Sequence, residues 1–302
     1  CLLSRGLGDV YKRQIQNNAL LVKVTCTKWN NTVTDKRISD EVTVDKNADD
    51  GFIRVSKRLA KVAVVKELNK LIGQVGNSII RKWCVPWEDG VHLITVDNLD
   101  NFERDLRAKA DKLDELKIEL RREWPDIVRD DQLRLGSAFN ASDYPEVEAI
   151  VGKYSINYLL RQLPSGDDIR VNLPNERVKA IRAEVERDVN DRIEAGMKSV
   201  HERVSKVLNS FIDGLDRHGT KGDGQQRASK FSDSTVTAIE ELAETLPNIN
   251  LTGDPALTAV SNDLILRMRD LDPQKLRDDP AERKNAADTA RDIAAKLTGF
   301  FD

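Results

Sequence analysis

An unbroken stripe of apolar residues in the second half of the chain is the feature that most constrains its fold. Between Asn175 and Asp216, apolar residues recur every three or four positions. They are Val178, Ile181, Val185, Val189, Ile193, Met197, Val200, Val204, Val207, Phe211 and Leu215. This spacing places them on one face of an α-helix that would be roughly 60 Å long. Because the stripe must be buried, we expect other helices or a second chain to cover it.

The composition also favours a mainly helical fold. Of the 302 residues, 33% are charged and 5% are aromatic, which is typical of long, solvated helices. The net charge is −3, with the first hundred residues basic overall and the remainder acidic. We therefore expect a mainly α protein with a small α+β unit at its N-terminal end, an elongated helical arm that carries a β-hairpin, and a C-terminal helical bundle.

The opening stretch, CLLSRGLGDVYKRQ, is interpreted as foreign to the protein. It resembles translated sequencing-adapter read-through and has no initiator methionine. We treat residues 1–14 as a non-native leader and leave them out of the fold prediction. Cys1 lies in this leader, and Cys26 and Cys84 are far apart with no Cys-x-x-Cys spacing. This cysteine usage indicates a reducing compartment such as the cytoplasm.

Residues 15–97 are predicted to form the small α+β unit. Alternating apolar and polar side chains at 19–29 indicate a half-buried strand. Asp50-Gly51 supplies the positive φ that a hairpin turn needs. The predicted elements are strands at 19–29, 41–44, 52–55 and 91–96, of which the middle two form the hairpin, and a helix at 60–83.

Residues 98–230 are predicted to form the helical arm. Its first helix spans Asn98 to Trp124, and Trp124-Pro125 is expected to end it. A hairpin is predicted near 154–173, and the glycine-rich stretch 216–230 is expected to be a mobile surface loop.

The C-terminal bundle is predicted to span residues 231–302. Three Asp-Pro pairs mark helix starts, because the Asp caps the first free amides and the Pro needs none. The predicted helices begin at Asp254-Pro255, Asp272-Pro273 and Asp279-Pro280, and a further one runs from Ser234 to Leu246.

The sequence offers little to catalysis or metal binding. Its histidines are His92, His201 and His218, and none has a partner at metal-ligand spacing. Cys84 and His92 could meet in space, but a buried core cysteine is the favoured interpretation. Residues 45–56 resemble a calcium loop only in their first half, since the sixth and twelfth positions lack the required Gly and Glu. We predict no enzyme activity, no cofactor and no metal.

A basic segment from Arg54 to Lys82 is the candidate for a nucleic-acid-binding surface. With the tryptophans that follow it, the segment could bind single-stranded nucleic acid, since cations neutralise phosphates and indoles stack on bases. The alternative, which we favour, is that the cations form a solvated helix face and the indoles fill the junction with the next strand. The candidate contacts are Arg54, Lys57, Arg58, Lys61, Arg81, Lys82, Trp83 and Trp87.

Several stretches together resemble a known family. They include LLVKVTCTKWNNTVTDKRISDEV, WCVPWEDGVHLI, FNASDYP, DDIRVNL, LPNINLTGDPAL and LDPQKLRDDPAERKNAADTA. In this order they are similar to a family of tailed-phage and prophage proteins known only as a domain of unknown function, over nearly the whole chain after Gln14. The resemblance implies a phage setting and no catalytic residues.

These observations lead to an expected function. We predict a non-catalytic phage protein, cytoplasmic in the bacterial host, that acts by binding or assembly through self-association or a protein partner. Single-stranded nucleic-acid binding by residues 54–82 is the alternative. No run of about 18 apolar residues occurs in the sequence, so we expect no membrane partner.

Overall fold

The chain is assembled from two compact units. The computed structural model describes residue 15 and residues 18–166, 174–219 and 231–297. Unit 1 combines Cys1–Lys23, Ile79–Phe102 and Leu159–Asp302, and unit 2 combines Val24–Ser78 and Glu103–Tyr158. Both units join stretches that are distant in sequence, which differs from the consecutive division into 15–97, 98–230 and 231–302. The predicted leader and most of the loop 216–230 lie outside the described residues.

A four-stranded sheet has the order β4-β5-β1-β6. Its strands are β1 (Ala19–Thr27), β4 (Val85–Glu88), β5 (Val91–Thr95) and β6 (Ser155–Gln162). β5 pairs antiparallel with β1, where Val22 lies opposite His92, and antiparallel with β4. The strands expected at 19–29 and 91–96 are confirmed. β4 was not expected, because its few residues follow a helix directly and contain a proline.

β6 corresponds to the first strand of the hairpin predicted near 154–173. Its neighbour in the sheet is β1, and the Thr27 and Ser155 hydroxyls lie 2.8 Å apart. The predicted second strand, at 167–173, lies outside the described residues.

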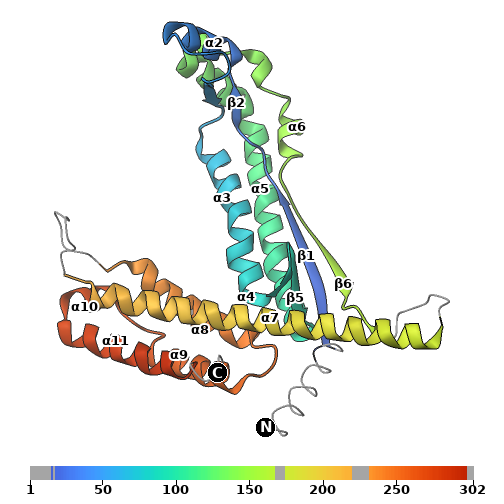
Figure 1. Cartoon of the computed structure of the whole chain (residues 1–302). Helices are drawn as coiled ribbons and strands as arrows, with labels where there is room; N and C mark the ends of the chain where they lie inside the picture. Colours follow the sequence, from blue (N-terminus) through green and yellow to red (C-terminus); the bar gives the residue numbers. More distant parts are fainter. Residues whose placement is uncertain (1–14, 16–17, 167–173, 220–230, 298–302) are drawn as a thin grey trace. The chain divides into compact units, whose positions relative to one another are not determined.

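The long helix of unit 1 is confirmed, since α7 spans Asn175–Asp216. Figure 1 shows α7 side by side with α8 (Asp233–Ile249) and α11 (Pro280–Ala295), and α9 (Pro255–Arg267) packs against α8. The short α10 (Pro273–Asp278) precedes α11. These helices cover the C-terminal half of the apolar stripe, as the predicted bundle required.

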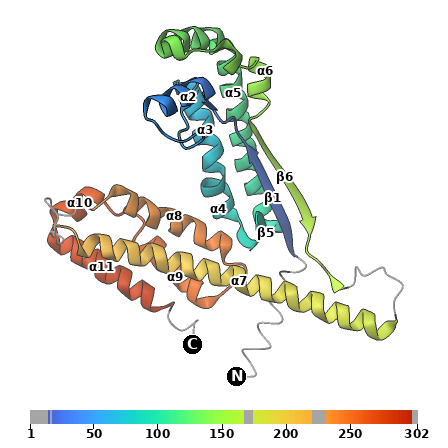
Figure 2. The same ribbon diagram turned by 45° about the horizontal axis from the view of Figure 1, so that its top comes forward.

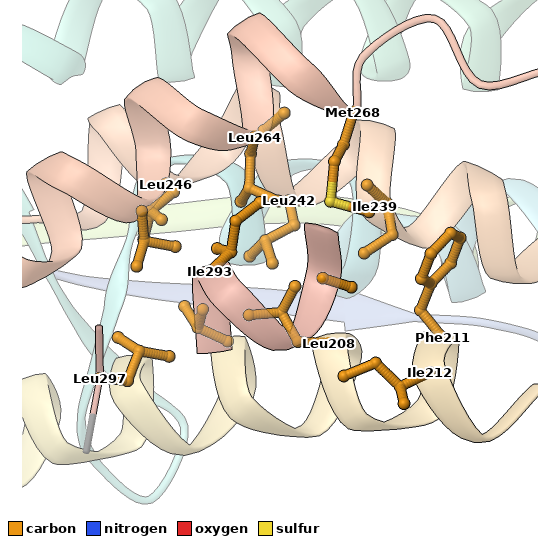
Figure 3. Close-up of a cluster of buried hydrophobic side chains, with 14 of the residues drawn as sticks. Leu208, Phe211, Ile212, Ile239, Leu242, Leu246, Leu264, Met268, Ile293 and Leu297 are labelled. Carbon is orange, nitrogen blue, oxygen red and sulfur yellow. The ribbon is translucent and has the colours of Figure 1, made fainter. Parts of the chain in front are cut away.

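Close-packed aliphatic and aromatic side chains fill the interior of this bundle (Figure 3). Leu208 and Phe211 of α7 are fully buried, as are Ile239 of α8 and Leu264 of α9. Phe211 also meets Phe231 edge to face, with ring centroids 5.8 Å apart. Burial of this apolar surface is the main source of the bundle's stability.

The three Asp-Pro signals begin helices as predicted. Asp254 Oδ1 accepts hydrogen bonds from the amides of Ala256 and Leu257, at the start of α9. Asp272 and Asp279 cap α10 and α11 in the same way. Each proline stands at the first helical turn, where its missing N–H leaves no carbonyl unpaired.

In unit 2, α3 (Ala63–Val75) lies beside α5 (Val96–Leu135), as Figure 1 and Figure 2 both show. Leu68 of α3 and Leu120 of α5 are fully buried in one cluster, which Tyr154 also joins. The short α6 (Val147–Val151) adds Ile150 to it. The helix predicted at 60–83 is thus observed as α3, which continues through a π-helical turn at Gly76–Ile80 into α4 (Arg81–Trp83).

The hairpin predicted at 41–44 and 52–55 is wrong. The first of these runs lies in α2 (Lys36–Asp45), and the pairing instead joins β2 (Thr32–Thr34) antiparallel to β3 (Ser56–Arg58). The reason is the helix start, because the Asp35 carboxylate accepts from the Ile38 amide at 3.0 Å. That cap outweighs the β propensity of the valines that follow it.

The predicted end of a helix at Trp124-Pro125 is also wrong, because α5 continues through Pro125 to Leu135. Proline removes one hydrogen bond of the helix and crowds the preceding turn. The residues on either side are nevertheless anchored in the core, since Trp124, Ile127 and Asp131 are all buried. Tertiary packing therefore overrides the local signal.

Among the described residues, no helix is long and apolar enough to span a membrane.

Candidate functional site

The candidate nucleic-acid contacts are divided between the two units. Unit 2 contains Arg54, Lys57, Arg58 and Lys61, whereas unit 1 contains Arg81, Lys82, Trp83 and Trp87. The structure therefore does not gather the predicted set within one compact unit. These residues were predicted to form a single surface because they are close in sequence. In the chain, however, α3 lies between the group from Arg54 to Lys61 and the group from Arg81 to Trp87.

Lys57 is a structural residue of unit 2. Its side chain is only 7% exposed, and its Nζ lies 2.7 Å from Asp35 and 2.6 Å from Asp143. It also donates to the Ala138 carbonyl at 2.9 Å. Desolvation acts to lower the pKa of Lys57, but the hydrogen bonds to Asp143 and Asp35 outweigh it and raise the pKa. All of these contacts of Lys57 are made within the protein. The prediction that Lys57 binds a phosphate group is therefore wrong.

The other basic residues of this half remain on the surface. Arg54, Arg58 and Lys61 are all exposed. Arg54 Nε donates to the Thr34 hydroxyl at 2.8 Å, which orients its guanidinium beside β2. Within the described part of the chain, these three side chains form no ion pair with a carboxylate.

Both candidate tryptophans are buried, as the favoured interpretation expected. Trp83 is 6% exposed and Trp87 is 9% exposed. The Lys82 ammonium lies 5.0 Å from the Trp83 ring centroid, and the Arg192 guanidinium lies 5.7 Å from that of Trp87. Their ring faces are therefore occupied by protein cations and core side chains, which leaves little surface on which a base could stack.

Unit 1 contains a cavity, which we call the α7–α8 cavity. Its volume is about 720 Å³, and its lining comes from α4, β4, β5, α7 and α8. This volume is within the range of sites that hold small molecules. Its charged and hydroxyl-bearing lining residues are Arg81, Ser199, Glu202, Arg203, Lys206, Ser210, Ser234, Thr235 and Glu241.

Arg203 is the most firmly held of the cavity's cations. Its Nη1 donates to the Arg81 carbonyl at 2.7 Å, and its Nη2 contacts the Thr245 hydroxyl at 3.4 Å. Burial lowers the pKa of Arg203, and the neighbouring Arg81 charge lowers it further, while Glu241 acts in the opposite direction. The partly desolvated Arg203 guanidinium thus lies near the positive charge of the exposed Arg81.

Cys84 and His92, which the sequence analysis considered as a pair, both line this cavity. Burial raises the pKa of the Cys84 thiol to about 12 and lowers the pKa of His92. A catalytic thiolate–imidazolium pair requires the opposite shifts. The described structure shows no hydrogen bond between the two side chains, and Cys84 is 4% exposed. The arrangement is that of a core cysteine.

The other two histidines have structural partners. His201 is fully buried, and its Nε2 lies 3.1 Å from Oδ2 of Asp254. His218 Nδ1 accepts a hydrogen bond from the Phe231 amide at 3.0 Å. Among the described residues, no group of three or more His, Cys, Asp or Glu side chains is placed to hold a metal ion. In the segment compared with a calcium loop, Asp45 is the last residue of α2.

The end of unit 2 that carries α2 exposes apolar side chains. Phe52 is 82% exposed and Val44 is 77% exposed. The residues that these two flank form a hydrogen-bonded loop, with Ala48 N donating to Thr43 O at 3.0 Å. We call Val44 and Phe52 with the half-buried Ile38, Val42 and Ile53 the α2 surface.

The sequence and the structure were compared with those of known proteins. The chain matched no protein-family model, no curated protein and no solved structure.

The sequence analysis missed Arg203 and Lys206 as potential functional residues. Both lie on α7 among many other charged residues, and no local motif distinguishes them. The signal that could have found them is the pairing of α7 with α8, which periodicity does not specify. Their shared environment arises only when α4, β4 and β5 close the space between the two helices.

Proposed function

We propose that the protein is a non-catalytic binding and assembly protein that associates with a second copy of itself through the α2 surface. The observation that carries this proposal is Phe52, a large apolar side chain that is 82% exposed on an ordered loop. Aromatic side chains presented in this way are typical anchors of protein interfaces.

The loop around Phe52 is held in place before any partner binds. The Asp35 amide donates to Val55 O at 2.9 Å, and the Val55 amide donates to Ser39 Oγ at 2.9 Å. Phe52 N itself donates to Asp49 O at 3.3 Å. Because these bonds hold the backbone at Phe52 and Val55, docking would cost little conformational entropy.

The α2 surface also lacks a covering core. Ser39 is the only buried residue of α2, although the helix carries Ile38, Val42 and Val44. An amphipathic helix normally buries its apolar side against its own protein. A near-neutral chain, with a net charge of −3, opposes self-association only weakly.

The state of the Cys84 thiol supports the proposal that the protein is not an enzyme. The buried Cys84 thiol, whose pKa is about 12, stays protonated near neutral pH and is a poor nucleophile. The resemblance to tailed-phage proteins supports a role in the cytoplasm of a bacterial host.

Light scattering of the purified chain over a wide concentration range tests self-association. We expect a dimer or larger oligomer that Phe52→Ser combined with Val44→Ser converts to a monomer without lowering the melting temperature. Leu266→Ser is the matched control, since Leu266 is 81% exposed in unit 1 and should leave the oligomer intact. A wild-type protein that stays monomeric throughout, or equal effects of the two surfaces, would contradict the proposal.

Single-stranded nucleic acid remains a second candidate ligand, favoured by the exposed cations Arg54, Arg58 and Lys61. Affinity for a labelled oligonucleotide should then fall with salt by about one unit of log–log slope for each phosphate contact. Changing these three residues to Glu should abolish binding. Lys57 is left unchanged, because its loss would unfold the local structure. Absence of binding at low salt would reject this candidate.

A further inference from the structure

We propose that the α7–α8 cavity is a binding site for a small phosphate-bearing molecule. The proposal is independent of the α2 surface, which belongs to the other unit. It rests on three cations around one cavity, on a buried histidine nitrogen that has no hydrogen-bond partner in the described structure, and on several hydroxyl groups of the same lining.

The charge around the cavity favours an anion. Arg81, Arg203 and Lys206 contribute three positive charges against two negative charges from Glu202 and Glu241. In the described part of the chain, none of these five side chains is within ion-pair distance of another. The cations are therefore not neutralised by direct contact with these carboxylates.

The position of Arg203 is fixed before a ligand arrives. Two of its guanidinium nitrogens are anchored, one on the Arg81 carbonyl and the other near the Thr245 hydroxyl. Arginine has five N–H donors in a planar fork, so donors remain for a phosphate oxygen. Lys206 lies one turn further along α7 and supplies a more flexible ammonium group.

The cavity lining also includes uncharged polar groups. His92 Nδ1 is buried and has no hydrogen-bond partner among the described residues. Because burial lowers the pKa of His92, the ring is neutral at pH 7 and can bond to a hydroxyl or amide group of a ligand. A buried nitrogen of this kind costs free energy unless a partner occupies the site.

Hydroxyl groups complete the lining. Ser199 and Ser210 of α7 and Ser234 and Thr235 of α8 all line the cavity. Ser234 and Thr235 stand in the first turn of α8, where the helix dipole also favours negative charge. Cations, hydroxyl donors and a volume of about 720 Å³ together suit a phosphate ester better than a bare ion.

Isothermal titration calorimetry at low salt tests the proposal with AMP, ribose 5-phosphate, inorganic phosphate and adenosine. If the phosphate group is recognised, AMP and ribose 5-phosphate bind more tightly than adenosine, and inorganic phosphate competes with them. If adenosine binds as tightly as AMP, or if no phosphate-bearing probe binds, the proposal is overturned.

Matched variants locate the site. Lys206→Gln should weaken binding of AMP about tenfold, because one charge-assisted contact is lost. Lys198→Gln is the control, since Lys198 is exposed on the same helix but does not line the cavity. Equal weakening by the two variants would show non-specific attraction and reject the site.

A second variant keeps the test independent of folding. Arg81→Gln changes an exposed side chain whose carbonyl still accepts from Arg203, so its melting temperature should match that of the wild type. We expect a loss of AMP affinity similar to that of Lys206→Gln. Retention of full affinity by both variants would overturn the assignment of the ligand to this cavity.

Discussion

Lys57 Nζ lies 2.6 Å from the carboxylate of Asp143 in the interior of unit 2. This ion pair joins β3 to a 3-10 turn at Ala141–Asp143 that follows α5. The same ammonium contacts Asp35, which caps α2. One buried cation thus connects three segments, and each of its two carboxylates is more than four-fifths buried.

Replacing Lys57 should therefore be costly. Lys57→Ala leaves two buried carboxylates without their cation, and we expect the free energy of unfolding to fall by about 3 kcal/mol. Arg58→Ala, at the exposed neighbouring position, should change it by less than about 0.5 kcal/mol. Urea denaturation of both variants provides the measurement. Similar values for the two would show that the buried cluster contributes nothing special.

Another buried carboxylate, that of Asp131, secures an unusual backbone conformation. It is 4% exposed and accepts hydrogen bonds from Ala60 N at 2.6 Å and from the Tyr144 hydroxyl at 2.8 Å. Ala60 has φ +47°, which is unfavourable for a residue with a side chain. Asp131 thus compensates for local strain while it holds α5 against the turn.

Comparison of two substitutions tests this role. Tyr144→Phe removes one hydrogen bond and should destabilise the protein by about 1 kcal/mol. Asp131→Ala removes the Oδ2 atom that accepts both hydrogen bonds and leaves the Ala60 amide buried, so we expect a loss of about 3 kcal/mol. Thermal or urea unfolding can rank the variants. A larger loss for Tyr144→Phe than for Asp131→Ala would contradict this account.

The parts of the fold that could be predicted are those that depend on local pattern. The stripe from Val178 to Leu215 specified α7, because a period near 3.6 is a property of one helix alone. The capping aspartates at 254, 272 and 279 were equally informative, since each bonds to amides two and three residues away. Such interactions exist before the chain has packed.

The remaining features depend on contacts between distant residues. Pro125 would end an isolated helix, but buried Trp124 and Ile127 hold the residues around it in α5. The sequence groups Lys57 with other basic residues, but in the fold its ammonium group pairs with Asp143, which is distant in sequence. The α7–α8 cavity likewise combines Arg81 with Arg203. No window of sequence contains either pair, so neither could be inferred locally.

The cap of α9 should matter more than the other Asp-Pro caps. Asp254 bonds to two helix amides and also to His201, which is fully buried. Within the described part of the chain, the Asp279 side chain bonds only to the amides at the start of α11. Asp279→Ala should cost about 1 kcal/mol of stability, and Asp254→Ala about 2 kcal/mol or more.

A double-mutant cycle separates the two contributions of Asp254. If the His201 contact is energetically important, His201→Gln combined with Asp254→Ala should cost less than the sum of the single changes. Full additivity would show that Asp254 acts only as a cap.

Acidification should weaken unit 1 through His92. Burial lowers the pKa of His92 below its ordinary value of 6.5, so the unfolded chain takes up a proton at a higher pH than the folded chain does. Neutral His92 therefore makes its full contribution to the stability of the folded protein at pH values above 6.5. This contribution falls as the pH drops below 6.5, and it stops changing below the folded-state pKa of His92.

The His92→Gln variant provides the comparison. Its urea-unfolding free energy should change less than that of the wild type between about pH 8 and pH 5, because glutamine does not titrate. The two proteins should show parallel curves above pH 7. Parallel curves across the whole range would remove His92 as a source of acid sensitivity.

The close approach of α7 to β4 allows a last prediction, which contrasts two helical glycines. A Cβ added to Gly196 would lie 2.8 Å from both the Pro86 carbonyl oxygen and Val85 Cγ1, whereas one added to Gly73 of α3 would meet nothing within 4 Å. Gly73→Ala should therefore raise stability by up to about 1 kcal/mol through helix propensity. Gly196→Ala should lower it by about 2 kcal/mol, because the Pro86 backbone cannot move aside without displacing β4. Urea unfolding would measure both, and stabilisation by Gly196→Ala would mean that α7 and β4 are not in contact in solution.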